Sequence, residues 1–142
     1  MSGYRQQALI DASLDAIWDL VGDPAHHPDW WPRVIEVNGE RFSEGATYIQ
    51  KTKGAMGMQT TSILIDRLED AREVRMRCQD TGTYCAWVLT EAQGSTFVDV
   101  EFGMEPTALP LRLWDATLGR RYFRRWLEES LEALGQAAKT PA

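Results

Sequence analysis

The chain has 142 residues, of which 44% are hydrophobic and 25% charged, a composition that suits one domain with a full core, so we expect residues 1 to 142 to form a single domain. Its formal net charge of -6 opposes binding to nucleic acid or to anionic membranes, because both require a basic surface. No segment approaches the roughly 20 apolar residues that span a bilayer, and the first residues lack a signal-peptide core, so we expect a cytoplasmic protein.

The N-terminal part of the chain predicts a strand, a short helix and an aromatic lid. Residues 4 to 11 alternate weakly and indicate a strand. Ser13 is a good N-cap, and Gly22 ends a helix of about two turns. Residues 24 to 32 are too rich in proline for a strand and too aromatic for a solvated loop. We therefore expect a lid in which Trp30 or Trp31 is buried.

A meander of strands follows, with short turns between them. We place these strands at residues 33–38, 46–53, 58–68, 73–79, 83–91 and 96–104. A two-residue loop at residues 81 and 82 would put Met76 opposite Trp87. The following turn puts Trp87 opposite Val100. Both turns give the same apolar face, which we expect to be the inside of the sheet.

The length of the loop at residues 69–72 decides which side chains of the earlier strands point inward. An even number of loop residues points Ile63 and Ile65 inward, and one more residue would reverse them. On the even register the interior is apolar at one end and polar at the other. The polar end comprises Tyr48, Gln50, Gln59 and Thr61.

Residues 107 to 138 carry the longest helical pattern. Thr107 suits the N-cap, and Pro110 is tolerated only in the first turn. At about 100° per residue, one face of this helix is mostly apolar and requires burial. That face comprises Leu109, Leu113, Ala116, Phe123, Leu127, Leu131, Leu134 and Ala138. Arg112, Gly119 and Arg120 interrupt it in the first half, where a cavity would tolerate them.

A second apolar stripe lies on the far side of the same helix, only in its first half. It comprises Leu111, Trp114, Leu118 and Tyr122. An exposed apolar stripe of this kind favours an interaction surface. We therefore expect it to dock a partner or a second copy of the chain, the latter giving a homodimer.

Four segments, together with the order of the elements, resemble one known superfamily. They are IDASLDAIWDLVGD at residues 10–23, WWPRV at 30–34, WVL at 87–89 and GST at 94–96. They are similar to the START-like, Bet v 1-like (SRPBCC) superfamily, most of all to its polyketide cyclase/dehydrase and lipid-transport branch. The resemblance implies an α+β helix-grip fold, in which a seven-stranded antiparallel sheet curls around a long C-terminal helix, with two short helices between strands 1 and 2. It also implies a cavity for apolar or aromatic small molecules.

Arg120 is the leading candidate for a functional residue. A guanidinium on the core face needs an anionic or carbonyl partner to offset its desolvation, and a ligand carboxylate or ketone would supply one. The alternative is that the side chain extends past the sheet edge into solvent, or pairs with an acidic residue.

Histidines and cysteines are few. His26 and His27 are adjacent and so point apart, and we expect no metal site. His27 either lies on the lid surface or turns to the cavity mouth as a general base. Cys78 and Cys85 face each other on the predicted register, but at a wide hydrogen-bonded position that suits a disulfide poorly, so we expect buried thiols. The sequence contains no GxSxG, Walker A or GxGxxG motif.

These observations support three hypotheses about function. The first is the binding of a lipid-like or polyketide-like apolar or aromatic small molecule between the sheet and the C-terminal helix, without a cofactor. The second is a cofactor-independent aromatase/cyclase, a lyase or isomerase in which Arg120 polarises a carbonyl and Tyr48 or His27 moves a proton. The third is an interaction module that uses the outer stripe. The candidate ligand-binding residues are Trp30, Tyr48, Gln50, Gln59, Thr61, Met76, Trp87, Val100, Ala116, Gly119, Arg120 and Phe123.

Overall fold

The fold is a curled antiparallel sheet that holds a C-terminal helix. The computed structural model describes residues 2–54, 57–105, 109–114 and 118–139. Its strands are β1 (Ser2–Ile10), β2 (Val34–Asn38), β3 (Thr47–Gly54), β4 (Gly57–Glu69), β5 (Glu73–Cys78), β6 (Thr83–Ala92) and β7 (Ser95–Met104), in the sheet order β1-β7-β6-β5-β4-β3-β2. Its helices are α1 (Leu14–Val21), the 3-10 turn η1 (Pro24–His26), α2 (His27–Trp30), α3 (Leu109–Trp114) and α4 (Arg120–Lys139). The predicted helix-grip fold is confirmed.

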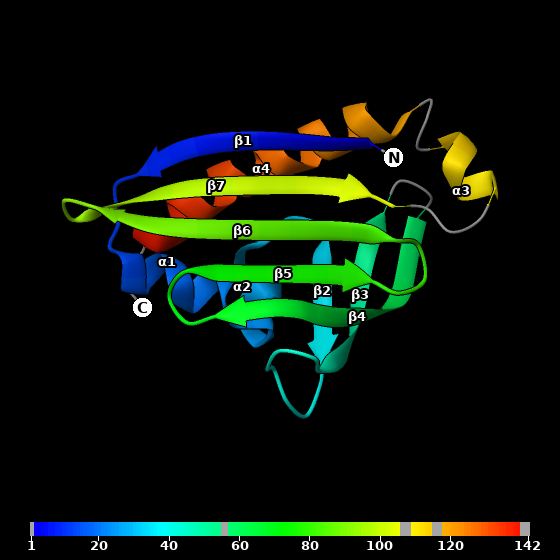
Figure 1. The fold of residues 1–142 in the computed structure, drawn as a ribbon, viewed down its shortest axis with the longest axis horizontal. Coiled ribbons are helices and arrows are strands. Elements are labelled where there is room, and N and C mark those ends of the chain that lie inside the picture. The colour runs from blue at the N-terminus through cyan, green and yellow to red at the C-terminus, as the bar shows by residue number, and fades with distance from the viewer. Residues whose placement is uncertain (1, 55–56, 106–108, 115–117, 140–142) are drawn as a thin grey trace.

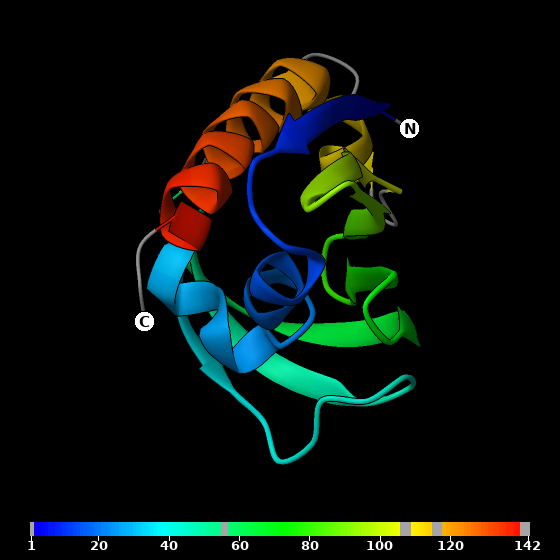
Figure 2. The ribbon, with the colours of Figure 1, turned by 90° about the vertical axis from the view of Figure 1, so that its left-hand side faces the viewer.

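The layers of the fold are visible in two views. In Figure 1, α4 runs behind β1 and β7 along one side of the sheet. Figure 2 shows the sheet curving away from β1 and α4, with α1 and α2 on its open side, near the C-terminal end of α4. The core between these layers contains the fully buried side chains of Trp87, Phe102, Phe123 and Leu127.

Local capping explains the N-terminal helices. The Ser13 Oγ accepts a hydrogen bond from the Ala16 amide at 3.2 Å, which satisfies one of the free donors at the start of α1. The Asp23 carboxylate accepts from the Ala25 amide at 3.1 Å in the same way at η1. Trp30 and Trp31 are both buried, which confirms the expected burial of the lid.

The β6–β7 hairpin has the predicted register, whereas the β5–β6 hairpin is shifted. Trp87 lies opposite Val100 as expected. Across β5 and β6, however, Met76 lies opposite Cys85, not opposite Trp87. The expected pairing is wrong because four residues, not two, separate β5 from β6, with Gly82 in the left-handed region at φ 80°. A shift of two residues preserves the face of each side chain, so the predicted inner face is still correct.

The side chains of β4 point to the predicted side of the sheet, but for a different reason. Its loop has three residues, an odd number, between Glu69 and Glu73, and such a loop alone would reverse the earlier strand. A bulge between Ile65 and Arg67 restores the facing. Ile63 and Ile65 are therefore buried, as expected.

The expected single helix over residues 107 to 138 is wrong for the described residues. α3 and α4 are separate helices, and Figure 1 shows α3 at one end of the sheet, away from the axis of α4. Leu113 was expected on the core face but is 60% exposed, because α3 does not continue the face of α4. Leu118 and Gly119 form a wider, π-type turn just before α4. Among the described residues, no helix is long and apolar enough to cross a membrane.

Candidate ligand-binding site

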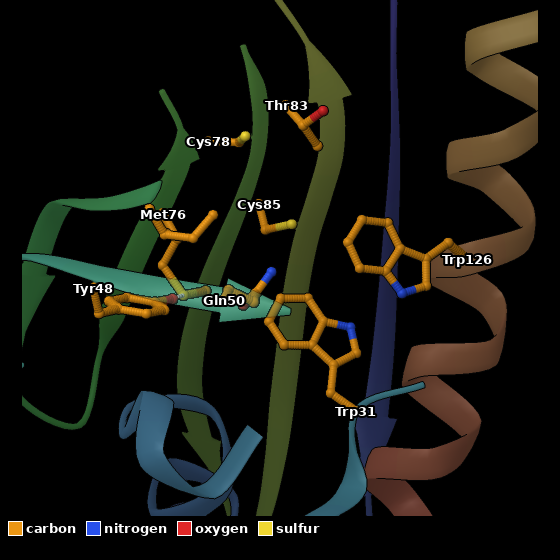
Figure 3. Close-up of a pocket in the computed structure, with 9 residues that line it drawn as sticks. Trp31, Tyr48, Gln50, Met76, Cys78, Thr83, Cys85 and Trp126 are labelled. Atoms are coloured by element: carbon orange, nitrogen blue, oxygen red, sulfur yellow. Dashed lines mark hydrogen bonds between the residues drawn. The ribbon is translucent and has the colours of Figure 1, made fainter. Parts of the chain in front are cut away.

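A cavity lies between the sheet and α4 (Figure 3). Its empty volume is about 290 Å³, which includes open space at its mouth. Strands β3 to β6 supply one side, and the segment after α2 and the middle of α4 supply the other. The lining residues are Trp31, Tyr48, Gln50, Ile63, Met76, Cys78, Thr83, Cys85 and Trp126.

Two indole rings form the helix-side wall of the cavity. The rings of Trp31 and Trp126 stack with centroids 5.5 Å apart and planes 16° from parallel. The Trp31 Nε1 donates to Ser130 Oγ at 2.8 Å, and the Trp126 Nε1 donates to the Pro32 carbonyl at 2.9 Å. Because both N–H groups are bonded within the protein, the rings are held in place before a ligand arrives.

The sheet-side wall carries three polar side chains, Tyr48, Gln50 and Thr83. The Tyr48 hydroxyl donates to the Met76 Sδ at 3.3 Å. Burial raises the pKa of Tyr48, so its hydroxyl keeps its proton at neutral pH. Gln50 is 8% exposed, and in Figure 3 its amide points into the cavity.

Both cysteines line the cavity as free thiols, which confirms the expected thiols. The register shift places Cys85 opposite Met76, so the expected direct pairing of Cys78 with Cys85 is wrong. Burial raises the pKa of the Cys85 thiol well above its usual value. Cys85 is therefore a neutral, apolar part of the wall.

His27 lies neither on the lid surface nor on the cavity wall, so both expected positions are wrong. It is fully buried, and its Nε2 lies 2.9 Å from the Val21 carbonyl oxygen. Its ring packs edge-on to Trp31, with centroids 4.9 Å apart. Burial lowers the pKa of His27 to about 4. The ring is therefore neutral at pH 7 and donates its Nε2 hydrogen to Val21, which suits a structural contact. No metal-binding group of three or more His, Cys, Asp or Glu residues is found in the described parts of the chain.

Arg120 is exposed, so the expectation that it lies on the buried face is wrong. It is the first residue of α4, and the buried face of that helix begins one turn later, at Phe123. The exposed guanidinium needs no ligand to offset desolvation. Its position fits the alternative stated above, in which the side chain extends into solvent.

The other predicted site residues divide into three groups. Tyr48, Gln50 and Met76 line the cavity. The buried core beside it contains Trp30, Trp87, Val100 and Phe123. Gly119 is buried before α4, Thr61 is half-buried, and Gln59 is exposed because the start of β4 extends beyond the core. Ala116 lies outside the described residues, so a pocket at that end of the helix stays a prediction.

Six lining residues are absent from the predicted set, namely Trp31, Ile63, Cys78, Thr83, Cys85 and Trp126. Cys78 and Cys85 could have been predicted as lining residues, because both fall on the predicted inner face of the meander. Trp126 flanks the apolar face of the helix, and Trp31 lies in the predicted lid. The sequence pattern does not show that residues 31–33 pack against α4. This packing brings the two indoles together.

The outer stripe is only partly described. Leu118 is 52% exposed. Tyr122 is half-buried and lies beneath the guanidinium of Arg33, 4.9 Å from its ring centroid. The side chains of Leu111 and Trp114 lie outside the described residues. The homodimer through this stripe therefore stays a prediction.

Comparison with known proteins identifies the family of this chain. The family model for polyketide cyclase/dehydrase and lipid transport matches residues 1–139. No curated protein matches the chain. A START superfamily protein from Mycobacterium smegmatis is 15% identical, with a TM-score of 0.76, and the match covers 96% of this chain and 97% of that one.

Two further solved structures have the same fold. The AHSA1-like protein from Aeromonas hydrophila is 14% identical, with a TM-score of 0.67 over 97% of this chain and 92% of that one. The di-domain ARO/CYC BexL from the BE-7585A biosynthetic pathway is 18% identical, with a TM-score of 0.62 over 97% of this chain and 48% of that one. These structural likenesses concern the fold alone, while the family model spans nearly the whole sequence. The chain belongs to the polyketide cyclase/dehydrase and lipid transport family.

Proposed function

We propose that this protein binds a compact, flat, apolar or aromatic small molecule in the cavity between β3–β6 and α4. The observation that carries the proposal is the composition of the wall. Two hydrogen-bonded indoles, Trp31 and Trp126, face a sheet surface that is mostly apolar and sulfur-containing. Its polar groups are the hydroxyls of Tyr48 and Thr83 and one amide, that of Gln50. Ligand sites are commonly mostly apolar pockets with a few placed polar groups.

The cavity is small. Its empty volume of about 290 Å³ includes open solvent at its mouth, so the enclosed space is below the roughly 300–1,000 Å³ of drug-sized sites. A compact ring compound enters it only if lining side chains move, and the extended chain of a lipid does not fit.

Binding is favoured over turnover by the state of the groups around the cavity. An aromatase/cyclase mechanism needs a residue that accepts a proton at neutral pH. Burial raises the pKa of Tyr48 and of Cys85, so both remain protonated. Arg120 and His27, the other residues considered for catalysis, do not line this cavity.

Titration of the protein with 2-naphthol, followed through the indole N–H resonances in NMR spectra, tests the proposal. The resonances of Trp31 and Trp126 should shift in the native protein. Cys85→Met should weaken binding at least about tenfold, because the longer side chain occupies the cavity. Ala86→Met is the matched control: it adds a similar volume at the next residue of β6, which faces the other side of the sheet.

Two results would refute the proposed site. One is a wild-type spectrum in which neither Trp31 nor Trp126 responds to 2-naphthol. The other is equal weakening by Cys85→Met and Ala86→Met, which would place the probe elsewhere.

A further inference from the structure

Gln50 lines the cavity, and its side-chain amide is not hydrogen-bonded to any described residue. The residue is 8% exposed, and its amide atoms are not among the fully buried atoms that lack a partner, so they meet the space of the cavity. Its backbone carbonyl accepts from the Thr61 hydroxyl at 3.5 Å, but this contact leaves the side-chain amide unused. A primary amide offers two donors and one acceptor oxygen, which a ligand in the cavity could bond.

The other polar groups of the cavity wall are partly engaged. The Thr83 hydroxyl accepts from the Thr81 hydroxyl at 2.9 Å and keeps its own hydrogen to donate. The Tyr48 hydroxyl donates to Met76 Sδ, and its oxygen can still accept. Within the described wall, Gln50 is therefore the side chain that offers two donors and an acceptor, none of them bonded to a described residue.

The backbone fixes the direction of this amide. Gln50 lies in the middle of β3, opposite Val37 of β2 and Thr61 of β4. Strands on both sides hold its backbone, and its side chain is on the inner face. In Figure 3 the amide points toward the space between Cys85 and Trp31. A side chain on a strand that is paired on both sides is well suited to orient a ligand.

The wall also carries no charge. None of its nine lining residues is acidic or basic. A carboxylate or an ammonium group in the cavity would lose its hydration without a counter-charge, which is a large penalty. This arrangement favours an uncharged ligand.

We infer that Gln50 determines ligand specificity by hydrogen bonding to a neutral hydroxyl or carbonyl group on an aromatic ring, so that the site takes phenols and aryl ketones and rejects carboxylates such as fatty acids. The inference rests on the proposed function, because it names the ligand class of the same cavity. The competing explanation is that only a trapped water molecule satisfies Gln50, in which case the amide does not discriminate between ligands.

Three probes that share the naphthalene ring and differ in one substituent separate these explanations. They are naphthalene, 2-naphthol and 2-naphthoate. Dissociation constants are measured by NMR titration for the wild type and for Gln50→Met, which keeps the length of the side chain and removes the amide. Gln59→Met is the matched control, since Gln59 is an exposed glutamine on the adjacent strand β4.

The wild type should bind 2-naphthol roughly 3- to 10-fold more tightly than naphthalene, as one net hydrogen bond implies, and 2-naphthoate should bind most weakly. Gln50→Met should abolish the preference for 2-naphthol and leave naphthalene binding intact, which also shows that the variant is folded. Gln59→Met should retain the wild-type order.

An unchanged preference for 2-naphthol in Gln50→Met overturns the inference, as does a wild type that prefers 2-naphthoate. The proposed function survives both results, because naphthalene still shifts the resonances of Trp31 and Trp126. If no probe shifts these resonances in the wild type, the proposed function fails as well.

Discussion

Two fully buried side chains, His27 and Trp87, each have a ring nitrogen without a hydrogen-bond partner among the described residues. Trp87 Nε1 has no partner in the described residues, and its ring meets Trp30 and Trp31 in T-shaped contacts with centroids 5.9 and 5.8 Å apart. Such contacts attract aromatic rings. His27 bonds through Nε2 alone, within a packed core. Gln50 differs from both because its amide meets the space of the cavity, which leaves it available to a ligand.

His27 should make the stability of the protein depend on pH. Its pKa is about 4 in the folded protein and about 6.5 in an unfolded chain, so the unfolded state binds a proton first as the pH falls. The stabilisation is therefore complete above pH 6.5 and is lost progressively down to pH 4. Between pH 7 and pH 5, wild type should lose roughly 2 kcal/mol more unfolding free energy than His27→Phe does. Urea denaturation at the two pH values measures this difference. An equal loss of stability in wild type and in His27→Phe would show that His27 is not the titrating group.

At the scale of elements, residues 31–33 fasten the aromatic lid to α4. Trp31 bonds to Ser130, Pro32 accepts from Trp126, and Arg33 donates to Glu129 at 3.1 Å. Their partners lie within about one turn of α4, from Trp126 to Ser130. These contacts fix both the position of the lid and the orientation of the cavity wall.

Ser130 is central to this attachment. Its Oγ accepts from Trp31 and donates to the Trp126 carbonyl at 2.6 Å. Ser130→Ala leaves the buried Trp31 N–H unpaired, so it should lower the free energy of unfolding by about 1–3 kcal/mol. Urea denaturation measures the loss. Glu132→Ala, on the exposed side of α4, should change stability by less than about 0.5 kcal/mol. A similar small change in Ser130→Ala would mean that the lid does not depend on this bond.

The order of the elements was predictable because caps, turns and alternating patterns are local. The exact pairing of residues between neighbouring strands was less predictable, because it depends on turn length and on bulges. The four-residue turn before Thr83 displaced Met76 by two positions, and the bulge after Ile65 offset an odd loop. The break between α3 and α4 was missed because the apolar period of residues 107 to 138 fits one helix equally well.

The candidate site was predictable only where strands define it. Tyr48, Gln50 and Met76 follow from alternation on the inner face. Arg120 was misplaced because a periodic pattern gives the face of a helix but not where the cover of that face ends, and Arg120 is exposed. His27 was misplaced because it is part of the lid, and the sequence does not show which lid side chains turn into the core.

At the scale of the whole molecule, the curled sheet and the helix enclose a core whose aromatic rings meet near the lid, where Trp31 contacts Trp87, Phe102 and Trp126. Figure 2 shows how the sheet curls around this core. The cavity adjoins this cluster, with Trp31 and Trp126 on one wall and Gln50 on the other. Elements far apart in the sequence therefore supply its two walls.

A crystal structure of the protein with 2-naphthol tests the central claim most directly. We predict electron density for the bicyclic ring between Cys85 and the indoles of Trp31 and Trp126, with the hydroxyl within hydrogen-bond distance of the Gln50 amide. Density for the probe at another surface, or side chains that close the cavity and leave only a water molecule at Gln50, would contradict the account.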